Sequence, residues 1–374
     1  MSTGLVLSGG GARAAYQVGV LKAVVEILGQ PEKNPFPVIS GSSAGAINSS
    51  VVACESDRFS EAIPKLEAVW RGLTSTDVHE LGGMAIAGAL FSLGRSVFHD
   101  GYSTGKPWSL LDNSPLRELL QQAVRIGRLS EILQQGHLSA ISITALGYTS
   151  GDTISFYQSH HDIPIWKRHR RIGSRAQLRH DHLMASTAIP GIYPAVKINR
   201  EYFGDGSVRQ TAPLSSALHL GAKKLFVIGV SHNPVVTEQE RQKTVHTPSL
   251  AQMTSHFFNS GFIDALEQDM ERLQRLNNLL QRLPEDELEK VEFREVDVLS
   301  ITPSRAFDKI AIEHLDTLPR SMRFLFKRLG ATGQGGGTSL ASYLMFETPF
   351  ISELIELGYQ DAMDKREEIS VFLS

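Results

Sequence analysis

The chain has 374 residues, of which 41% are hydrophobic and 21% are charged, and its formal net charge is −3 at pH 7. This length can bury a large core and suffices for one large domain or two smaller ones, while the slight acidity argues against a general nucleic-acid binder. The only cysteine, Cys54, excludes an intramolecular disulfide and a cysteine-rich metal site, which fits a reducing compartment.

The first third of the chain predicts alternating strands and helices. A buried strand over Leu5–Leu7 leads into the glycine turn Gly9–Gly11, and a helix follows from about Ala12 to Leu28 with apolar residues at i, i+3, i+4 and i+7. A second strand over Val38–Ser40 precedes a helix-like stretch over Ala46–Cys54. Short apolar strands between helices predict an α/β fold with a mostly parallel sheet that is covered on both faces.

Later elements continue this pattern and then change in character. We expect strands over Leu138–Leu146, Leu225–Val230 and Val296–Ile301, a helix from Ser114–Pro115 to about Val124, and a long amphipathic helix over Phe262–Leu283. From about Asn233 the chain becomes mainly helical, with a charged loop at residues 238–243 and a glycine stretch at residues 334–337. The apolar stripe of the long helix is expected to pack on the core, with a dimer or membrane contact as the alternative.

Two segments bear on membranes. The uncharged segment Leu81–Gly94 is shorter than the roughly 20 residues that a spanning helix needs, so we expect either a buried or lid segment or a flap that contacts lipid. Strand-like sequence begins at Gly4, which leaves no room for a signal peptide ahead of it. The expected location is therefore cytoplasmic.

Ser43 is the first candidate for chemistry. It stands in Gly41-Ser42-Ser43-Ala44-Gly45, between the second predicted strand and its helix. A strand that turns sharply into a helix exposes the serine hydroxyl at the turn, and small neighbours such as Gly41 and Gly45 let the strained backbone pack closely. This pattern is typical of a nucleophile elbow.

The glycine turn that includes Gly9, Gly10 and Gly11 is the second candidate. A turn between a strand and a helix aims main-chain N–H groups at an anion, either the oxyanion of a hydrolase or a phosphate. The spacing of Gly9, Gly11 and Ala14 also matches the dinucleotide fingerprint. However, the elbow at Gly41 falls where that fold needs its ribose-binding acid, which argues against a dinucleotide.

Asp205 is the third candidate, in the stretch Tyr202-Phe203-Gly204-Asp205-Gly206-Ser207. Glycines on both sides of an aspartate after a short apolar approach predict a tight turn that displays the carboxylate. The alternative is an ordinary Asp-Gly hairpin turn without a catalytic role. Because the carboxyl ends of parallel strands meet at one edge of a sheet, all three candidates can come together.

The chain resembles the patatin-like phospholipases, which are serine lipid acyl hydrolases. The resemblance rests on four stretches in order: SGGGARAAYQVGVL from Ser8, GSSAGA from Gly41, MASTAIPGIYPAV from Met184 and FGDGSVRQTAPLSSALHLGAKKLFVIGVS from Phe203. Ala14 and Ser207 depart from the usual family residues, and both are small.

The resemblance implies a three-layer α/β/α sandwich and acyl-ester hydrolysis without a metal or cofactor. It implies a catalytic dyad of Ser43 and Asp205, and an oxyanion hole from Gly9, Gly10, Gly11 and the main chain of Arg13. We accordingly expect a catalytic core over residues 1–232 and a mainly helical region over residues 233–374, in which a late strand near residues 291–301 completes the core.

Three alternatives stay open from the sequence. A Ser–Asp–His triad would take His232, which follows the strand ending at Val230. A thioesterase or transacylase would need the same residues, and a catalytically weak lipid-binding or regulatory module would explain Ala14 and Ser207 as signs of decay. A lone aspartate would need desolvation to raise its pKa before it could serve as a base.

The basic segment Trp166–His182 carries six arginines and lysines against one acid, Asp181. It is either a solvated loop or a surface that attracts anionic lipid. The expected partners are therefore a lipid acyl ester and, through this segment, an anionic membrane, while the sequence says nothing on the oligomeric state.

Overall fold

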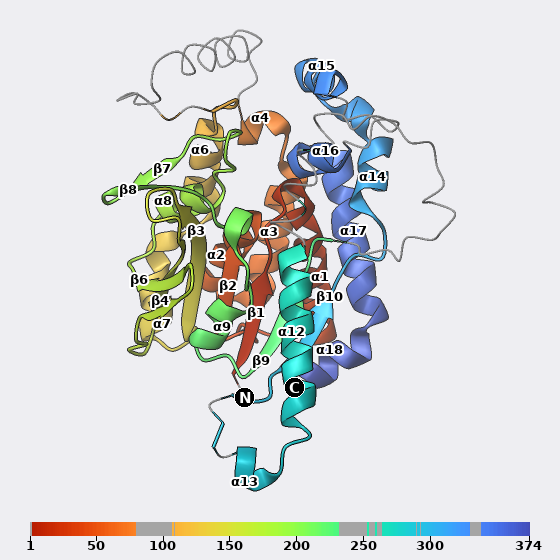
Figure 1. Ribbon diagram of the computed structural model, residues 1–374. Coiled ribbons are helices and arrows are strands. Elements are labelled where there is room, and N and C mark those ends of the chain that lie inside the picture. The colour runs from red at the N-terminus through yellow and green to blue at the C-terminus, as the bar shows by residue number, and fades with distance from the viewer. Residues whose placement is uncertain are drawn as a thin grey trace.

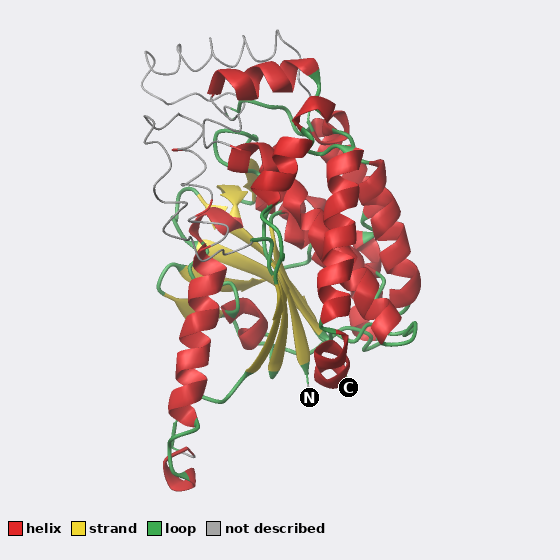
Figure 2. Ribbon diagram, turned by 90° about the vertical axis from the view of Figure 1, so that its right-hand side faces the viewer, coloured by secondary structure: helices red, strands yellow, loops and turns green. Residues whose placement is uncertain are grey.

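The N-terminal strand β1 (Thr3–Leu7) lies inside the sheet of the protein, with β9 (Lys224–Ile228) on one side and β2 (Val38–Ser42) on the other. The structure is a computed structural model that describes residues 2–79, 107, 109–231, 253, 259, 264–288, 290, 291, 293–329 and 338–374. Figure 1 shows the arrangement, and Figure 2 shows the sheet between helices on both faces. The predicted three-layer α/β/α sandwich is confirmed.

Five neighbouring strands in the order β10-β9-β1-β2-β3 run parallel, and they include β3 (Ala140–Gly147) and β10 (Asp297–Ile301). The sheet continues with antiparallel pairs. The additional strands are β4 (Thr153–Ser159), β5 (Trp166–Arg168), β6 (Arg171–Arg175), β7 (Val196–Ile198) and β8 (Glu201–Asp205). Strand β8 pairs antiparallel with the end of β3, which brings Asp205 opposite Ala145 at the carboxyl edge of the parallel strands.

The helices divide between the two faces of the sheet. Leu5 and Leu7 of β1 belong to the larger apolar cluster, whereas Val6 belongs to the smaller one, because successive side chains of a strand point to opposite faces. The larger cluster includes residues of α1 (Ala15–Ile27), α2 (Ala44–Cys54), α3 (Phe59–Gly72), α6 (Ser114–Ala123) and α17 (Thr348–Asp364). The smaller cluster includes residues of α9 (Ser215–His219) and α12 (Ala265–Leu280).

The remaining described helices are short or lie toward the C-terminus. They are η1 (Gly11–Ala14), α4 (Ser75–Val78), η2 (Ile126–Arg128), α7 (Leu129–Gln134), α8 (His180–Ser186), η3 (Gly206–Arg209), α13 (Glu285–Leu288), α14 (Phe307–Glu313), η5 (Leu315–Thr317), α15 (Arg320–Leu329), α16 (Thr338–Leu344) and α18 (Arg366–Leu373). The predicted helix from Ala12 therefore begins with the tight turn η1 before α1. The predicted helix over Phe262–Leu283 is confirmed by α12, which ends at Leu280, three residues earlier than predicted.

The basic segment Trp166–His182 differs from the predicted loop. It forms the antiparallel pair β5–β6 at the edge of the sheet, then enters α8. The segments Leu81–Gly94, 238–243 and 334–337, and the alternative base His232, lie outside the described residues. In the part of the chain that is described, no helix combines the length and the hydrophobicity that a bilayer crossing requires.

Candidate functional site

Ser43 occupies the sharp turn between the end of β2 and the start of α2. Its backbone has φ 52° and ψ −131°, a region that L-residues rarely adopt and that costs about 1–3 kcal/mol. A Cβ on Gly45 would lie 2.5 Å from the carbonyl oxygen of Ser8, and one on Gly41 would lie 2.6 Å from the carbonyl oxygen of Gly45. Only glycine fits at either position, so the local sequence is built for this strained turn.

Asp205 contacts Ser43 directly. The Ser43 hydroxyl donates a hydrogen bond of 2.5 Å to Oδ2 of Asp205, and Oδ1 of the same carboxylate accepts the main-chain N–H of Ser207 at 2.9 Å. Ser43 is 2% exposed and Asp205 is fully buried. A Cβ on Gly206 would clash with the carbonyl oxygen of Thr144, so the glycine lets the Asp205 turn pack against β3.

Burial sets the protonation of Asp205. Loss of solvation raises the pKa of this carboxyl to about 7, although the hydrogen bonds from Ser43 and Ser207 oppose the rise. A carboxylate with a pKa near neutrality is a much stronger base than an ordinary aspartate. The arrangement can therefore take a proton from the Ser43 hydroxyl without an imidazole.

A hydroxyl relay holds the backbone of Ser43. The Ser43 N–H donates to Oγ of Ser186 at 2.9 Å, and this hydroxyl donates to the carbonyl oxygen of Thr144 at 2.6 Å. Both serines are buried, and the relay fixes the elbow to β3. Ser186 lies in the MASTAIPGIYPAV stretch that carries the family resemblance, but nothing in that stretch predicts its bond to the Ser43 N–H.

The glycine turn lies beside the elbow and is fixed by close packing. Gly11 has φ 56°, and a Cβ on it would clash with the carbonyl oxygen of Tyr343. Among the described residues, no acceptor takes a hydrogen bond from the N–H of Gly9, Gly10 or Gly11. Ala14 has φ −68°, so the alanine that departs from the family pattern occupies ordinary helical backbone.

Arg13 behaves differently from the expectation for its main chain. Its N–H donates to the carbonyl oxygen of Gly10 at 3.1 Å and is thereby engaged within the turn. Its side chain, 4% exposed, extends to the C-terminal helices. There Nε donates to Ser342 Oγ at 2.8 Å, and Nη2 donates to Asp308 Oδ1 at 2.6 Å and to Ser339 Oγ at 2.9 Å. The guanidinium also lies 4.1 Å from the centroid of the Tyr343 ring.

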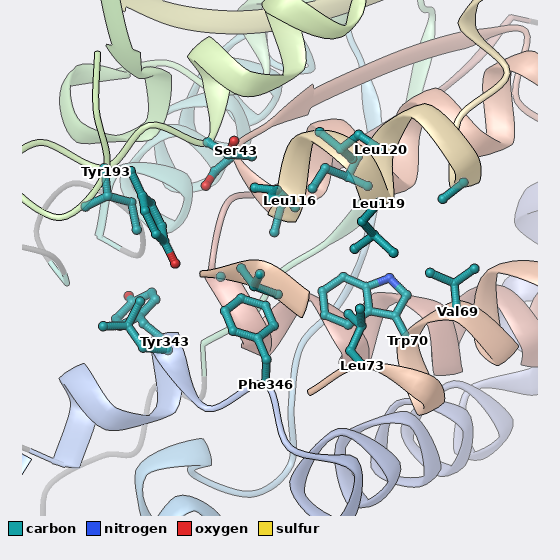
Figure 3. Close-up of a pocket in the computed structure, with 18 of the residues that line it drawn as sticks. Ser43, Val69, Trp70, Leu73, Leu116, Leu119, Leu120, Tyr193, Tyr343 and Phe346 are labelled. Atoms are coloured by element: carbon teal, nitrogen blue, oxygen red, sulfur yellow. The ribbon is translucent and has the colours of Figure 1, made fainter. Parts of the chain in front are cut away.

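A narrow apolar pocket of about 60 Å³ opens at Ser43. Its walls come from α2, α3 and α6 and from the C-terminal residues Tyr343, Leu344 and Phe346. Figure 3 shows Ser43 at one end of the pocket and Val69 and Trp70 at the other. These lining residues are not predicted from the sequence, because nothing local in α3 or α16 indicates that they approach the elbow.

No imidazole supports the dyad among the described residues. The hydrogen bonds of the Ser43 hydroxyl and of the Asp205 carboxylate are to each other and to the Ser207 N–H. His79, which donates to or accepts from the Tyr193 hydroxyl at 3.1 Å, has its pKa lowered to about 4 by burial. The described part of the chain also contains no group of three His, Cys, Asp or Glu side chains that could hold a metal ion.

The model of one protein family, described as patatin-like phospholipase, matches residues 5–218, more than half of the chain. The chain belongs to the patatin-like phospholipase family. It is 26% identical over 215 residues to a cGAMP-activated phospholipase of Pseudomonas aeruginosa, an alignment that covers 58% of this chain and 55% of that protein. The chain thus spans about half the length of this curated relative.

The chain is also similar to two further proteins whose names are those of phospholipases. The chain is 38% identical over 76 residues to the lysophospholipase nte1 of Aspergillus terreus, which covers 19% of this chain and 5% of that protein. Among solved structures, it is similar to the human GIVD cytosolic phospholipase A2 at a TM-score of 0.47 and 11% identity, covering 100% of this chain and 59% of that chain.

Proposed function

We propose that the protein is a serine hydrolase that cleaves acyl esters of lipids, with Ser43 as the nucleophile and Asp205 as the base. The observation that carries this proposal is the 2.5 Å hydrogen bond between the two buried side chains at the head of an apolar pocket. Membership of a family of phospholipases supports the lipid substrate.

The proposed reaction has two stages. Ser43 Oγ attacks the acyl carbonyl carbon and its proton passes to Asp205, which then protonates the departing alcohol as the ester bond breaks. Water next attacks the acyl-enzyme and gives a proton to Asp205, and the fatty acid leaves as Ser43 regains its hydrogen. The dipole of α2, which begins directly after Ser43, favours the negative charge that develops there.

The glycine turn is proposed to stabilise the oxyanion. The N–H groups of Gly9, Gly10 and Gly11 are the candidate donors, because none of them is used by a described acceptor. The Arg13 N–H is already bonded to Gly10, so we assign Arg13 to holding the turn through its side chain. Loss of one oxyanion donor typically lowers the rate about 10²- to 10³-fold.

The apolar pocket is proposed to hold the acyl chain. Its side chains are almost all hydrocarbon, so an acyl chain replaces water there at a gain of about 25 cal/mol per Å² of buried apolar surface. The names of two relatives, a phospholipase and a lysophospholipase, point to phospholipid esters as the first substrates to test. Cytoplasmic location and peripheral contact with an anionic membrane stay predictions.

A fluorophosphonate probe and a lipid panel test the proposal together. We expect the probe to label the wild type and not Ser43→Ala, and we expect Asp205→Asn to release fatty acid about 10²- to 10⁴-fold more slowly. His232→Ala serves as the control for the triad, and it should retain activity. Failure of the wild type to react with the probe would favour a lipid-binding module, and a folded but inactive His232→Ala would favour the triad.

A further inference from the structure

A second cleft lies on the face of the sheet opposite the acyl pocket. Its volume is about 610 Å³, and it is bordered by the β5–β6 hairpin, α9, α12 and the residues that precede β10. Leu214 and Leu273, which line it, belong to the smaller apolar cluster with Val6, whereas the pocket residues Val51 and Leu120 belong to the larger cluster. Figure 1 shows α9 and α12 together in front of the sheet.

The lining of this cleft is strongly positive. It contains four arginines against one acid, Asp269, which gives a formal charge of +3 with His219 neutral. The arginines are Arg168, Arg171, Arg272 and Arg294. The formal net charge of the whole chain is −3, so the charge of this cleft is opposite in sign to that of the chain.

The arginines of the cleft lack the carboxylate partners that their neighbours have. On the same hairpin, Arg170 forms an ion pair with Asp152 at 3.6 Å and Arg175 forms one with Asp162. Within the described residues, Arg168, Arg171 and Arg272 form no ion pair. The carboxylate of Asp269 accepts the main-chain N–H of Leu214 at 3.0 Å and so is already committed to α9.

Flat ring surfaces accompany these charges. The His219 ring stacks on the Trp166 indole with centroids 4.8 Å apart and planes at 15°, and Phe293, which also lines the cleft, is 62% exposed. Burial and the charges of Arg168 and Arg171 lower the pKa of His219, so it presents a neutral ring. The cleft therefore combines guanidinium groups with apolar ring faces.

We propose that this cleft is a binding site for a phosphate-bearing ligand that carries at least two negative charges. The planar guanidinium offers paired N–H donors that match phosphate oxygens. Asp269, the one carboxyl group of the cleft, lies close enough to Arg171 and Arg272 to interact with their charges, but it forms no ion pair with either. The phosphate groups can belong to a free organic phosphate or to a phosphorylated lipid headgroup. The site stands apart from Ser43 and does not depend on the proposed hydrolase activity.

Calorimetric titration with inorganic pyrophosphate tests whether the cleft binds a free phosphate compound. Cosedimentation with phosphatidylcholine vesicles, with or without phosphatidylinositol bisphosphate, tests whether it binds a phosphorylated lipid headgroup. The full-length Arg171→Gln and Arg272→Gln variants should each bind about tenfold more weakly, and binding should weaken as salt rises. Arg175→Gln is the matched control on the same hairpin, because its side chain is paired with Asp162 and does not line the cleft.

Each outcome bears on the site. The proposed site is supported if pyrophosphate, or the vesicles with phosphatidylinositol bisphosphate, bind to the wild type and to Arg175→Gln but not to the two cleft variants. The probe that binds shows whether the ligand is a free phosphate compound or a lipid headgroup. Absence of binding to both probes at low salt overturns the proposal, as does an equal loss in Arg175→Gln. Unfolding curves of all three variants show that the comparison is between folded proteins, and Ser43→Ala should bind as the wild type does.

Discussion

At the scale of single residues, the site depends on how one carboxyl group is buried. Asp205 has no solvent exposure, and its strongest contacts are a hydroxyl and a main-chain N–H, neither of which carries a charge. Among the described residues no cation offsets the loss of solvation, so the pKa of Asp205 rises to about 7 from an ordinary 3.8. In the proposed mechanism, burial supplies the basicity that a histidine supplies in a triad.

The pH dependence of hydrolysis follows from this pKa. The base must be ionised, so kcat/KM should be nearly constant above about pH 8 and fall about tenfold per pH unit well below pH 7. The measurement is initial-rate hydrolysis of a p-nitrophenyl ester from pH 5 to pH 9, corrected for the uncatalysed rate. A rate that stays flat down to pH 5 would show that Asp205 is not the base.

The same group should affect folding stability. Between about pH 4 and pH 7 the unfolded chain has lost this proton while the folded chain keeps it, so Asp205 lowers the free energy of unfolding progressively as pH rises. In Asp205→Asn this titration is absent. The free energy of unfolding of Asp205→Asn, relative to the wild type, should increase by on the order of 2 kcal/mol from pH 5 to pH 8.

Urea denaturation at the two pH values measures this difference. A difference between variant and wild type that is the same at both pH values would contradict a raised pKa in the folded state, whatever its absolute size.

At the scale of elements, the sequence predicts where the five parallel strands lie, but not the strands from β4 to β8. The strands at Leu5–Leu7 and Val38–Ser40 were recognisable because they are short apolar runs followed by turn residues. The structure extends the second strand to Ser42 and starts α2 at Ala44, so Ser43 alone makes the turn. The rule that parallel strands end at one edge predicts the contact of Ser43 with Asp205, but Asp205 reaches that edge on β8, which runs antiparallel to β3.

Other elements were beyond the reach of local patterns. The β5–β6 pair has no apolar alternation, since half of its residues are charged, so its sequence is also typical of a solvated loop. The contribution of Tyr343 and Phe346 to the pocket depends on contacts across about 300 residues of sequence, for which no spacing rule exists. Ser186 was visible in a motif, but its bond to the Ser43 N–H requires the folded geometry.

The link between η1 and the C-terminal helices gives a prediction. Arg13→Met removes buried hydrogen bonds to Ser339 and Ser342 and should lower the free energy of unfolding by roughly 2–3 kcal/mol. It should also lower kcat more than it raises KM, because the turn that carries the Gly10 and Gly11 N–H groups loses its anchor.

Asp308→Asn is the matched comparison for Arg13→Met. Asp308 is 40% exposed, so this variant should lose no more than about 1 kcal/mol. Denaturation curves and steady-state kinetics on both variants check the prediction. An Arg13→Met variant with unchanged kcat would mean that the turn keeps its geometry without the arginine.

At the scale of the whole molecule, the C-terminal helices are part of one core with the matched family region. Gly19 of α1 and Gly358 of α17 face the partner helix, and a Cβ on either would clash with a carbonyl oxygen of that helix. The Tyr16 hydroxyl also donates to Oδ2 of Asp361 at 2.9 Å. Glycines at the crossing let the two backbones approach closely, which buries both helices against the sheet.

Gly358→Ala tests this packing. The added methyl group meets the main chain of Tyr16, which cannot rotate away, so we expect a loss of about 1–3 kcal/mol in the free energy of unfolding. Gly72→Ala, in α3 with open space around the added methyl group, should be neutral or stabilising by up to about 1 kcal/mol. Equal effects of the two substitutions in thermal unfolding would argue against close contact between α1 and α17.

The pocket has one wall from α3 and α6 and another from Tyr343, Leu344 and Phe346, and the guanidinium of Arg13 finds its acceptors only after residue 307. During translation, the nascent chain therefore displays its serine elbow long before the ribosome delivers the second wall. An acyl chain has no complete enclosure until Phe346 has been added. A protein with the proposed activity would in this way be harmless to the cell's own membranes while it is still being made.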